Sequence, residues 1–208
     1  SITDSERATL TKLAADIWSY FDQYTVEEDN WLTPDNVQLD PPVGPARRTS
    51  PTNIGLQLAC TLAARDFGFI DTSDMLRRME RTLDTIERMD KWNGHLYNWY
   101  ETSTLRPLPP LYVSTVDSGN FVGYLVTVKE GIAEYAAEAA AARKGGTGIA
   151  QQTSRLIARL GKLINATDFR PLYDEASQLF TLGYHASADR KETILYDLLA
   201  SEARQSSF

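Results

Sequence analysis

The sequence predicts an all-α fold made of antiparallel helix pairs, and three observations lead to this prediction. Apolar residues recur at the three-four spacing of amphipathic helices through most of the chain. Serine, proline and paired glycines stand where such helices would start and stop. The connections between the helices alternate between short and long, which is the pattern expected of helix hairpins packed side by side.

Length and composition favour one soluble globular domain. The chain has 208 residues, of which 42% are hydrophobic and 24% charged, so it can bury a core. The formal net charge of −7 argues against a nucleic-acid partner, because binding a phosphate backbone requires clustered lysine and arginine. Cys60 is the single cysteine, and His95 and His185 lie far apart without a cysteine nearby. We therefore expect no internal disulfide and no metal site.

The first three predicted helices are amphipathic. The first is capped by Asp4 or Ser5 and ends near Tyr24, the second opens at Ser50-Pro51, and the third begins at Ser73. A very short connection at Gly68 separates the second from the third. The side chains expected to face inward are Leu10, Leu13, Ala14, Ile17, Trp18 and Phe21 in the first helix, Ile54, Leu58, Ala59 and Leu62 in the second, and Leu76, Met79, Leu83 and Ile86 in the third.

Three further helices are predicted in the second half. The fourth begins at Ser118 or Asn120 and ends at Gly145-Gly146, and the fifth carries Ile149, Leu156, Ile157, Leu160 and Leu163 on one side. The sixth is the closing segment 194–208, in which Leu195, Leu198 and Leu199 share a face with Glu202. Partial burial on such a stripe would raise the pKa of Glu202 and favour the protonated form that a general acid needs. The alternative is a structural glutamate paired with an arginine.

Three long connections, 25–49, 91–117 and 166–193, are the most informative part of the pattern. In an array of antiparallel pairs every second connection emerges at the same end, so we expect all three at one end of the molecule. Loops longer than about 12–15 residues are uncommon in compact domains unless they have a function. These loops hold Trp31, Trp92, Trp99, Tyr97, Tyr100, Tyr112, Tyr173 and Tyr184, interleaved with Asp35, Asp40, Glu101, Asp117 and Asp174.

Flat aromatic faces beside carboxylates and amides suit a sugar ring, which offers an apolar C–H face and a rim of hydroxyls. The loops as a set therefore predict a saccharide groove. The alternative for each single aromatic is that it holds a long loop against the helix ends.

Three loop motifs carry more specific expectations. Arg47 and Arg48 are expected to hold acidic residues of neighbouring loops. The stretch "GHLYNWYETSTLRPLPP" predicts a small hairpin at the rim of a cleft. Asp117, in "YVSTVDSGN", stands where backbone amides at a helix start favour an ionised carboxylate, either as the cap itself or as a partner of a sugar hydroxyl.

Five stretches resemble successive motifs of a known family. They are "NWLTPDNVQLDPP", "RTSPTNIGL", "GHLYNWY", "PLPPLYVSTVDSGN" and "YDLLASEAR", and they occur in order over nearly the whole chain. They are similar to the glycoamylase-like cyclisation domain of bacterial cyclic β-1,2-glucan synthases. The resemblance implies about half of an (α/α)6 toroid, with small β-hairpin segments in the long loops and the active site at the loop end.

The resemblance also implies an activity. A linear β-1,2-glucan chain would be transferred onto its own non-reducing end with retention at the anomeric carbon, without metal or nucleotide. Retention normally uses two carboxyl groups, and Glu202 in "SEAR" is the candidate acid/base. The residues that match motif positions lining the glucan subsites are Trp31, Asp35, Arg48, Asn53, Trp99, Asp117 and Asn120. One departure is Glu101, where the motif "NWYxT" is expected to carry an aspartate.

On this interpretation residues 1–208 form one partial domain, truncated at its C-terminus, with the nucleophile beyond Phe208. The expected partners are β-1,2-glucan, the other domains of a larger synthase at the cytoplasmic side of the bacterial inner membrane, and a second copy through the exposed surface of a half-ring. No membrane-spanning segment is expected within these residues. Two alternatives stay open: a β-1,2-glucan hydrolase of the same fold, and a non-catalytic helical scaffold that binds glucan or protein.

Overall fold

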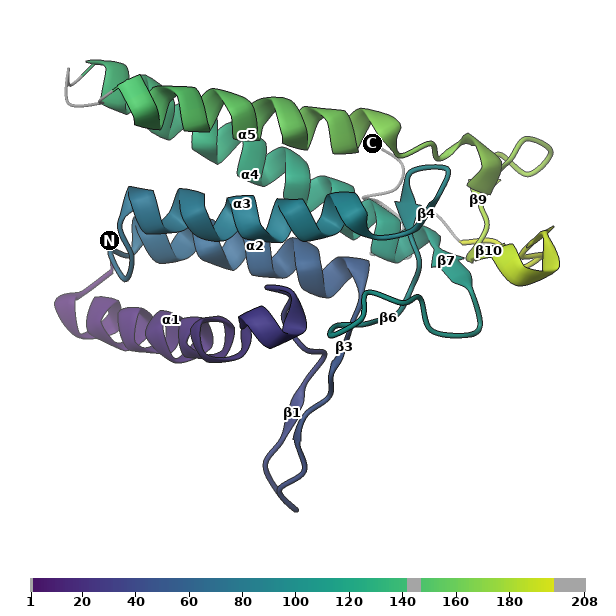
Figure 1. Cartoon of the computed structure of the whole chain (residues 1–208), viewed down its shortest axis with the longest axis horizontal. Coiled ribbons are helices and arrows are strands. Elements are labelled where there is room, and N and C mark those ends of the chain that lie inside the picture. Colours follow the sequence, from purple (N-terminus) through teal and green to yellow (C-terminus); the bar gives the residue numbers. More distant parts are fainter. Residues whose placement is uncertain (1, 142–146, 197–208) are drawn as a thin grey trace.

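Five helices run back and forth along one axis in the computed structural model, which describes residues 2–141 and 147–196 (Figure 1). They are α1 (Asp4–Tyr24), α2 (Pro51–Asp66), α3 (Thr72–Arg88), α4 (Thr115–Ala141) and α5 (Thr147–Ala166). α1, α3 and α5 run in one direction, and α2 and α4 run in the other (Figure 1). The predicted all-α class built of antiparallel helix pairs is therefore confirmed.

The predicted sixth helix is not found where the described chain ends. Leu195 forms an antiparallel bridge with Thr181, and the Tyr196 amide donates to the Phe180 carbonyl, so this stretch is extended. The prediction that Leu195 begins a helical face is wrong, because it pairs with a loop instead. The rest of that segment, Glu202 included, lies outside the described residues.

All three long connections lie at the same end of the helices, as predicted (Figure 1). The 3-10 helices η1 (Glu27–Asp29), η2 (Arg170–Leu172) and η3 (Ala186–Ala188) lie within them. Their strands are β1 (Val37–Gln38), β2 (Gly44–Pro45), β3 (Arg48–Thr49), β4 (Lys91–Trp92), β5 (His95–Leu96), β6 (Tyr100–Glu101), β7 (Tyr112–Ser114), β8 (Tyr173–Asp174), β9 (Leu179–Phe180), β10 (Gly183–His185) and β11 (Arg190–Lys191).

Short antiparallel ladders connect the three loops to one another. β3 of the first loop pairs with β6 of the second, and β7 of the second pairs with β10 of the third. The other pairs, β1–β2, β4–β5, β8–β9 and β10–β11, lie within single loops. The predicted hairpin after Tyr97 is therefore only partly right. Tyr100 does bridge to Pro107, but the strand before the turn finds its main partner in β3.

The core lies where α2 and α4 pack closely together. A Cβ atom on Gly55 would come within 2.6 Å of the Tyr124 ring, and one on Gly131 within 2.6 Å of Leu62, so both glycines allow the close approach. α3 packs on α2 and α5, and α5 packs on α4. The side chains that fill the core include Leu32, Ile54, Leu58, Met75, Leu76, Met79, Leu83, Ile86, Leu96, Tyr100, Leu125, Ile132, Leu156 and Leu160.

The predicted inward face of α1 is only partly buried. Trp18 and Phe21 pack against Ala64 of α2, whereas Leu10, Leu13 and Ile17 keep 52%, 54% and 50% of their surface exposed. α1 packs mainly on α2. The buried residues of its stripe, Trp18 and Phe21, lie in its second half, so less of the apolar stripe before them is covered.

The helix starts agree with the sequence at α2 and differ elsewhere. Ser50 caps α2 with Pro51 in the first turn, as predicted. Thr3 caps α1 in a capping box with Glu6, rather than Asp4 or Ser5, and Asp71 caps α3, which starts one residue before the predicted Ser73. α4 begins at Thr115, and the Ser114 hydroxyl accepts from the Asp117 amide at 3.2 Å. Asp117 is therefore not the cap, and its side chain is free for other partners.

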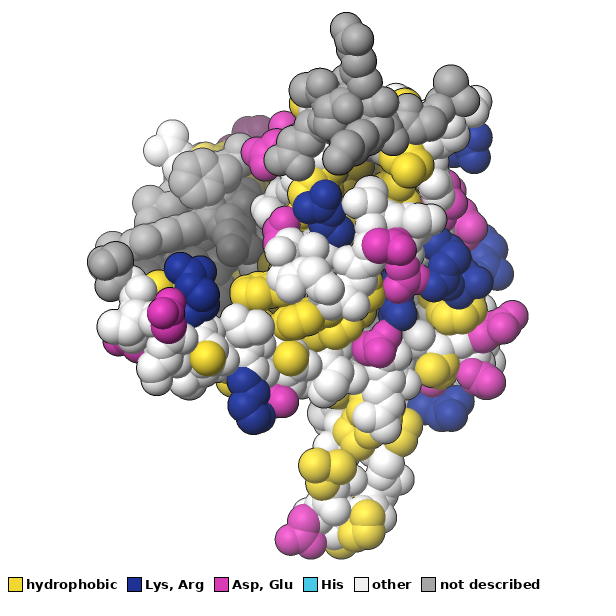
Figure 2. All heavy atoms as spheres, turned by 90° about the vertical axis from the view of Figure 1, so that its left-hand side faces the viewer, with side chains coloured by type: hydrophobic (Ala, Val, Ile, Leu, Met, Phe, Trp, Pro, Cys, Tyr) yellow, Lys and Arg dark blue, Asp and Glu magenta, His cyan; other side chains and the backbone are white. Residues whose placement is uncertain are grey.

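The β1–β2 hairpin projects away from the helices (Figure 1), and Figure 2 shows apolar side chains along it. Leu39 and Val43 near its tip are 77% and 74% exposed. A membrane-spanning segment would need a longer and more continuously apolar helix than any found in the described ranges.

Candidate functional site

Six predicted binding residues are joined by a network of side-chain contacts at the loop end. They come from two loops, from β3, and from the N-terminal ends of α2 and α4. The six are Asp35 in the first loop, Arg48 on β3, Asn53 on α2, Trp99 in the second loop, and Asp117 and Asn120 on α4.

Asp35 is the centre of one half of the network. Its Oδ2 accepts from Arg48 Nη2 at 3.0 Å and from Arg48 Nε at 3.3 Å, and its Oδ1 accepts from Asn53 Nδ2 at 3.2 Å. A guanidinium that donates through two nitrogens is held in one plane, so its orientation is defined. Arg47, the other arginine of the motif, donates to the buried Asp29 at 3.4 Å. Both arginines thus hold acidic residues, but the prediction that these acids belong to neighbouring loops is wrong, because Asp29 and Asp35 lie in the same loop as the arginines.

Trp99 connects the two halves of the network. The Arg48 guanidinium lies 4.7 Å from the centre of the indole ring, in a cation–π contact. When the Asn98 carboxamide is oriented to satisfy its neighbours, its oxygen accepts from Trp99 Nε1 at 3.2 Å and its nitrogen donates to Asp117 Oδ2 at 2.9 Å. One face of the indole contacts Arg48, so a ligand that stacked on the ring would have to use the opposite face.

Asp117 is the centre of the second half. Its Oδ1 accepts from the Thr52 hydroxyl at 2.6 Å, and the Thr52 oxygen in turn accepts from Asn120 Nδ2 at 3.2 Å. Thr52 and Asp117 lie in the first turns of α2 and α4, where the positive ends of the helix dipoles stabilise a carboxylate. The arrangement offers two carboxylates and several amides, which are the groups that bind sugar hydroxyls.

Sequence reasoning missed two members of this network, Thr52 and Asn98. Each is adjacent to a residue that was singled out, in "SPTN" and "YNWY". No motif position pointed to either residue. The packing of α2 against α4 brings Thr52 to Asp117, and the fold of the second loop brings Asn98 to it.

Trp31 lies apart from the other six. Its indole contacts Arg81 of α3, whose guanidinium is 4.1 Å from the ring centre, and it lines a cavity bounded by α1, α2 and α3. Its carbonyl oxygen accepts from Gln57 of α2. Glu202, the candidate acid/base, lies outside the described residues.

Most other loop aromatics contact one another or the core. Trp92 stacks on Tyr184 with ring centres 4.1 Å apart, Tyr112 contacts His185, and Tyr173 contacts Phe180. Tyr100 is fully buried, and its burial raises the pKa of its phenol. For these residues the structural alternative to sugar binding is correct: they hold the long loops together. Among the described residues, no group of three or more His, Cys, Asp or Glu has the arrangement of a metal site.

Comparisons with known proteins extend these observations. A family model described as "Protein of unknown function (DUF3131)" matches residues 12–142. The chain is 46% identical over 127 residues, or 61% of its length, to the cyclic β-(1,2)-glucan synthase NdvB of Rhizobium meliloti (strain 1021), of which the match spans only 4%. The resemblance to a cyclic β-1,2-glucan synthase is therefore confirmed, while the chain spans a small part of that relative.

Solved structures share the fold at low sequence identity. A putative glucoamylase from Bacteroides fragilis NCTC 9343 matches 88% of this chain and 41% of its own, with a TM-score of 0.69 and 20% identity. An endo-β-1,2-glucanase from Chitinophaga pinensis, in complex with sophorotriose and glucose, matches 94% of this chain and 44% of its own, with a TM-score of 0.71 and 15% identity. An endo-β-1,2-glucanase mutant from Talaromyces funiculosus, in complex with β-1,2-glucan, matches 94% of this chain and 45% of its own, with a TM-score of 0.66 and 11% identity. The chain thus has the fold of part of a glucoamylase-like (α/α)6 toroid.

Proposed function

The chain belongs to the family described as "Protein of unknown function (DUF3131)", and from that premise we propose that it is part of a glucan-processing (α/α)6 domain that cyclises linear β-1,2-glucan by retaining transglycosylation. The similarity to a cyclic β-(1,2)-glucan synthase supports this choice of substrate. Because the chain spans 41% and 44% of two solved structures of the same fold, we propose that residues 1–208 supply the N-terminal half of the toroid.

The network around Asp35 and Asp117 is the observation that carries the proposal. Glucan hydroxyls would bind the carboxylate oxygens and the Asn53 and Asn120 amides, and a sugar ring would lie against the face of Trp99 opposite Arg48. Because Thr52 and Asn98 already hold Asp117 from both sides, its carboxylate is oriented before the ligand arrives. In this scheme Asp117 positions the sugar and is not itself the acid.

Glu202 is the proposed acid/base. In retaining chemistry one carboxyl group attacks the anomeric carbon while the other protonates the leaving oxygen and later deprotonates the incoming hydroxyl. When the incoming hydroxyl belongs to the non-reducing end of the same chain, the glycosyl–enzyme bond breaks and a ring closes, so no water is consumed.

The test is product analysis with linear β-1,2-glucan, using the whole protein that carries this chain. Mass spectrometry distinguishes the outcomes, because a cyclic product lacks the mass of one water relative to a linear chain of the same length. Glu202→Gln is expected to lower turnover by about 10²–10⁴-fold. Asp117→Asn is expected to raise KM more than it lowers kcat. The matched control is Asp16→Asn on α1, an exposed residue paired with Lys12, which should leave both constants unchanged.

Hydrolysis is the second candidate, because two solved structures with this fold are named endo-β-1,2-glucanases. Short linear sugars without a ring would assign the chain to that activity. Glucan recovered unchanged by the wild-type protein would reject both enzymatic proposals, and glucan binding without turnover would indicate a non-catalytic scaffold.

A further inference from the structure

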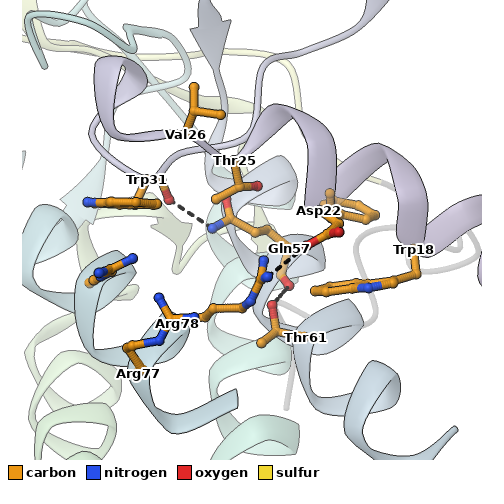
Figure 3. A pocket seen from close by; sticks show the side chains of 11 residues that line it. Trp18, Asp22, Thr25, Val26, Trp31, Gln57, Thr61, Arg77 and Arg78 are labelled. Atoms are coloured by element: carbon orange, nitrogen blue, oxygen red, sulfur yellow. Dashed lines mark hydrogen bonds and ion pairs between the residues drawn. The ribbon is translucent and has the colours of Figure 1, made fainter. Parts of the chain in front are cut away.

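The cavity that Trp31 lines lies between α1, α2 and α3, apart from the contact network around Asp35 and Asp117. It encloses about 230 Å³, and Figure 3 shows the side chains that surround it. α1 contributes Trp18 and Asp22, α2 contributes Gln57 and Thr61, and α3 contributes arginines. Apart from Trp31, none of the predicted glucan-binding residues lines it.

Two of its arginines are stacked on tryptophans. Arg81 lies 4.1 Å from the centre of the Trp31 ring, and Arg78 lies 5.3 Å from the centre of the Trp18 ring. A guanidinium that stacks on an aromatic face keeps its N–H groups in its own plane, where they are free to bind an acceptor. The tryptophans therefore hold the arginines in a defined orientation without using their hydrogen-bonding capacity.

The charges around the cavity do not balance. Arg78 forms ion pairs with Asp22 at 2.7 Å and with Asp74 at 3.0 Å, and Arg77 pairs with Asp74. Arg81 makes no ion pair with any described residue, and its guanidinium lies against the Trp31 ring. Three arginines thus face two aspartates, which leaves one positive charge in a chain whose formal net charge is −7.

A buried hydroxyl in the cavity wall also lacks a partner. Thr25, at the end of α1, lines the cavity, and its Oγ1 atom is buried without a hydrogen-bond partner. Buried polar atoms usually have a partner, because an unpaired one costs about 1–3 kcal/mol. By contrast, the Gln57 amide is fully used by the Thr33 amide, the Trp31 carbonyl and the Thr82 hydroxyl. A ligand in the cavity could therefore supply a hydrogen-bond partner to Thr25 and an ion-pair partner to Arg81.

We propose that this cavity binds a small flat organic carboxylate. The free N–H groups of Arg81 pair with the carboxylate, which supplies the missing negative charge, and Thr25 Oγ1 donates to it. The ring of the ligand contacts Trp18, Phe21 and Val26, which form the apolar part of the lining. A cavity of about 150 Å³ accommodates benzene, so this one has room for a single ring with its carboxylate. The site is separate from the proposed glucan site, so the test of this proposal does not depend on the proposed function.

The experiment is calorimetric titration of the whole protein that carries this chain with sodium benzoate at constant ionic strength. One benzoate is expected to bind per chain, and neutral benzyl alcohol and inorganic phosphate are expected to bind at least about tenfold more weakly. Equal affinity for benzyl alcohol would overturn recognition of the charge. Tighter binding of inorganic phosphate would overturn recognition of the ring.

Two arginines of α3 provide a matched pair of variants. Arg81→Gln is expected to raise the Kd for benzoate about tenfold or more, whereas Arg88→Gln, an exposed residue in the last turn of the same helix, should change it less than about twofold. Equal effects would show that only net charge matters and would reject the site.

Thr25→Val keeps the shape of the side chain and removes the orphan hydroxyl, so it should weaken binding about threefold while leaving thermal unfolding unchanged or raised. If Arg81→Gln does not fold, Arg81→Lys takes its place, since it keeps the charge but loses the planar fork. Unchanged benzoate affinity in Arg81→Lys and Thr25→Val would reject the proposal.

Discussion

α1 and α3 have the same kind of apolar spacing and very different surroundings. Met75, Leu76, Met79, Leu83 and Ile86 of α3 are at most 1% exposed, because that helix packs on both α2 and α5. The matching stripe of α1 is buried only at Trp18 and Phe21, and three residues before them are half exposed. Periodicity therefore identifies which side of a helix can be buried, whereas neighbouring elements determine how much of that side is covered.

The largest contrast is expected between two leucines on these stripes. Leu83→Ala in α3 should lower the free energy of unfolding by about 3 kcal/mol, because it leaves a cavity in a closely packed core. Leu13→Ala in α1, at 54% exposure, should lower it by less than about 0.5 kcal/mol. Urea denaturation of both variants measures the difference. If Leu13→Ala costs as much as Leu83→Ala, the stripe of α1 is covered in solution, as the predicted self-association requires.

A smaller effect is expected from the polar contacts that connect the loop after α1 to α2 and α3. Gln57→Leu removes the partner of the Thr33 amide and leaves the Trp31 carbonyl with a single 3.3 Å bond from Thr82. It should lower the free energy of unfolding by about 2 kcal/mol. The control is Gln152→Leu on α5, which removes a single half-buried bond to Glu80 and should cost less than about 0.5 kcal/mol. Equal losses in thermal melts would show that the loop is held by its apolar contacts instead.

The pH dependence of stability near neutral pH should come from the buried histidine of the second long loop, His95. His95 is buried, its Nε2 bonds the Asp168 carbonyl beside the Phe169 ring, and its burial lowers the pKa of its imidazole below 6.5. The neutral form is favoured on folding, so this contribution to stability is fully present above pH 6.5 and is lost as the pH falls through the lowered pKa.

Urea denaturation at about pH 7.5 and about pH 5.5 measures this contribution. The free energy of unfolding should be lower at the acidic pH, and the difference should shrink in His95→Gln. An unchanged pH dependence in that variant would assign it to other titratable groups.

Much of the candidate site could be predicted because aromatic and acidic residues gather in the long loops and because short motifs there resemble a known family. Asp35, Arg48, Trp99 and Asp117 match those motifs, and the structure joins them through direct and bridging contacts. Trp31 carries the same signal but faces α3 instead, because the chain turns through left-handed backbone at Asn30 and Trp31. A direction change of that kind leaves no periodic pattern in the sequence.

The sequence alone determined the helical class, the start of α2 and the gathering of the long loops at one end. These follow from local chemistry, since side-chain spacing and capping act within a few residues, and from the alternation of chain direction. Tertiary structure decided how much of each apolar stripe is covered, which aromatics support loops, where Trp31 points, and that Thr52 and Asn98 orient Asp117. Each of these depends on contacts between residues distant in the chain, and such contacts are set by how whole elements pack, which no short stretch encodes.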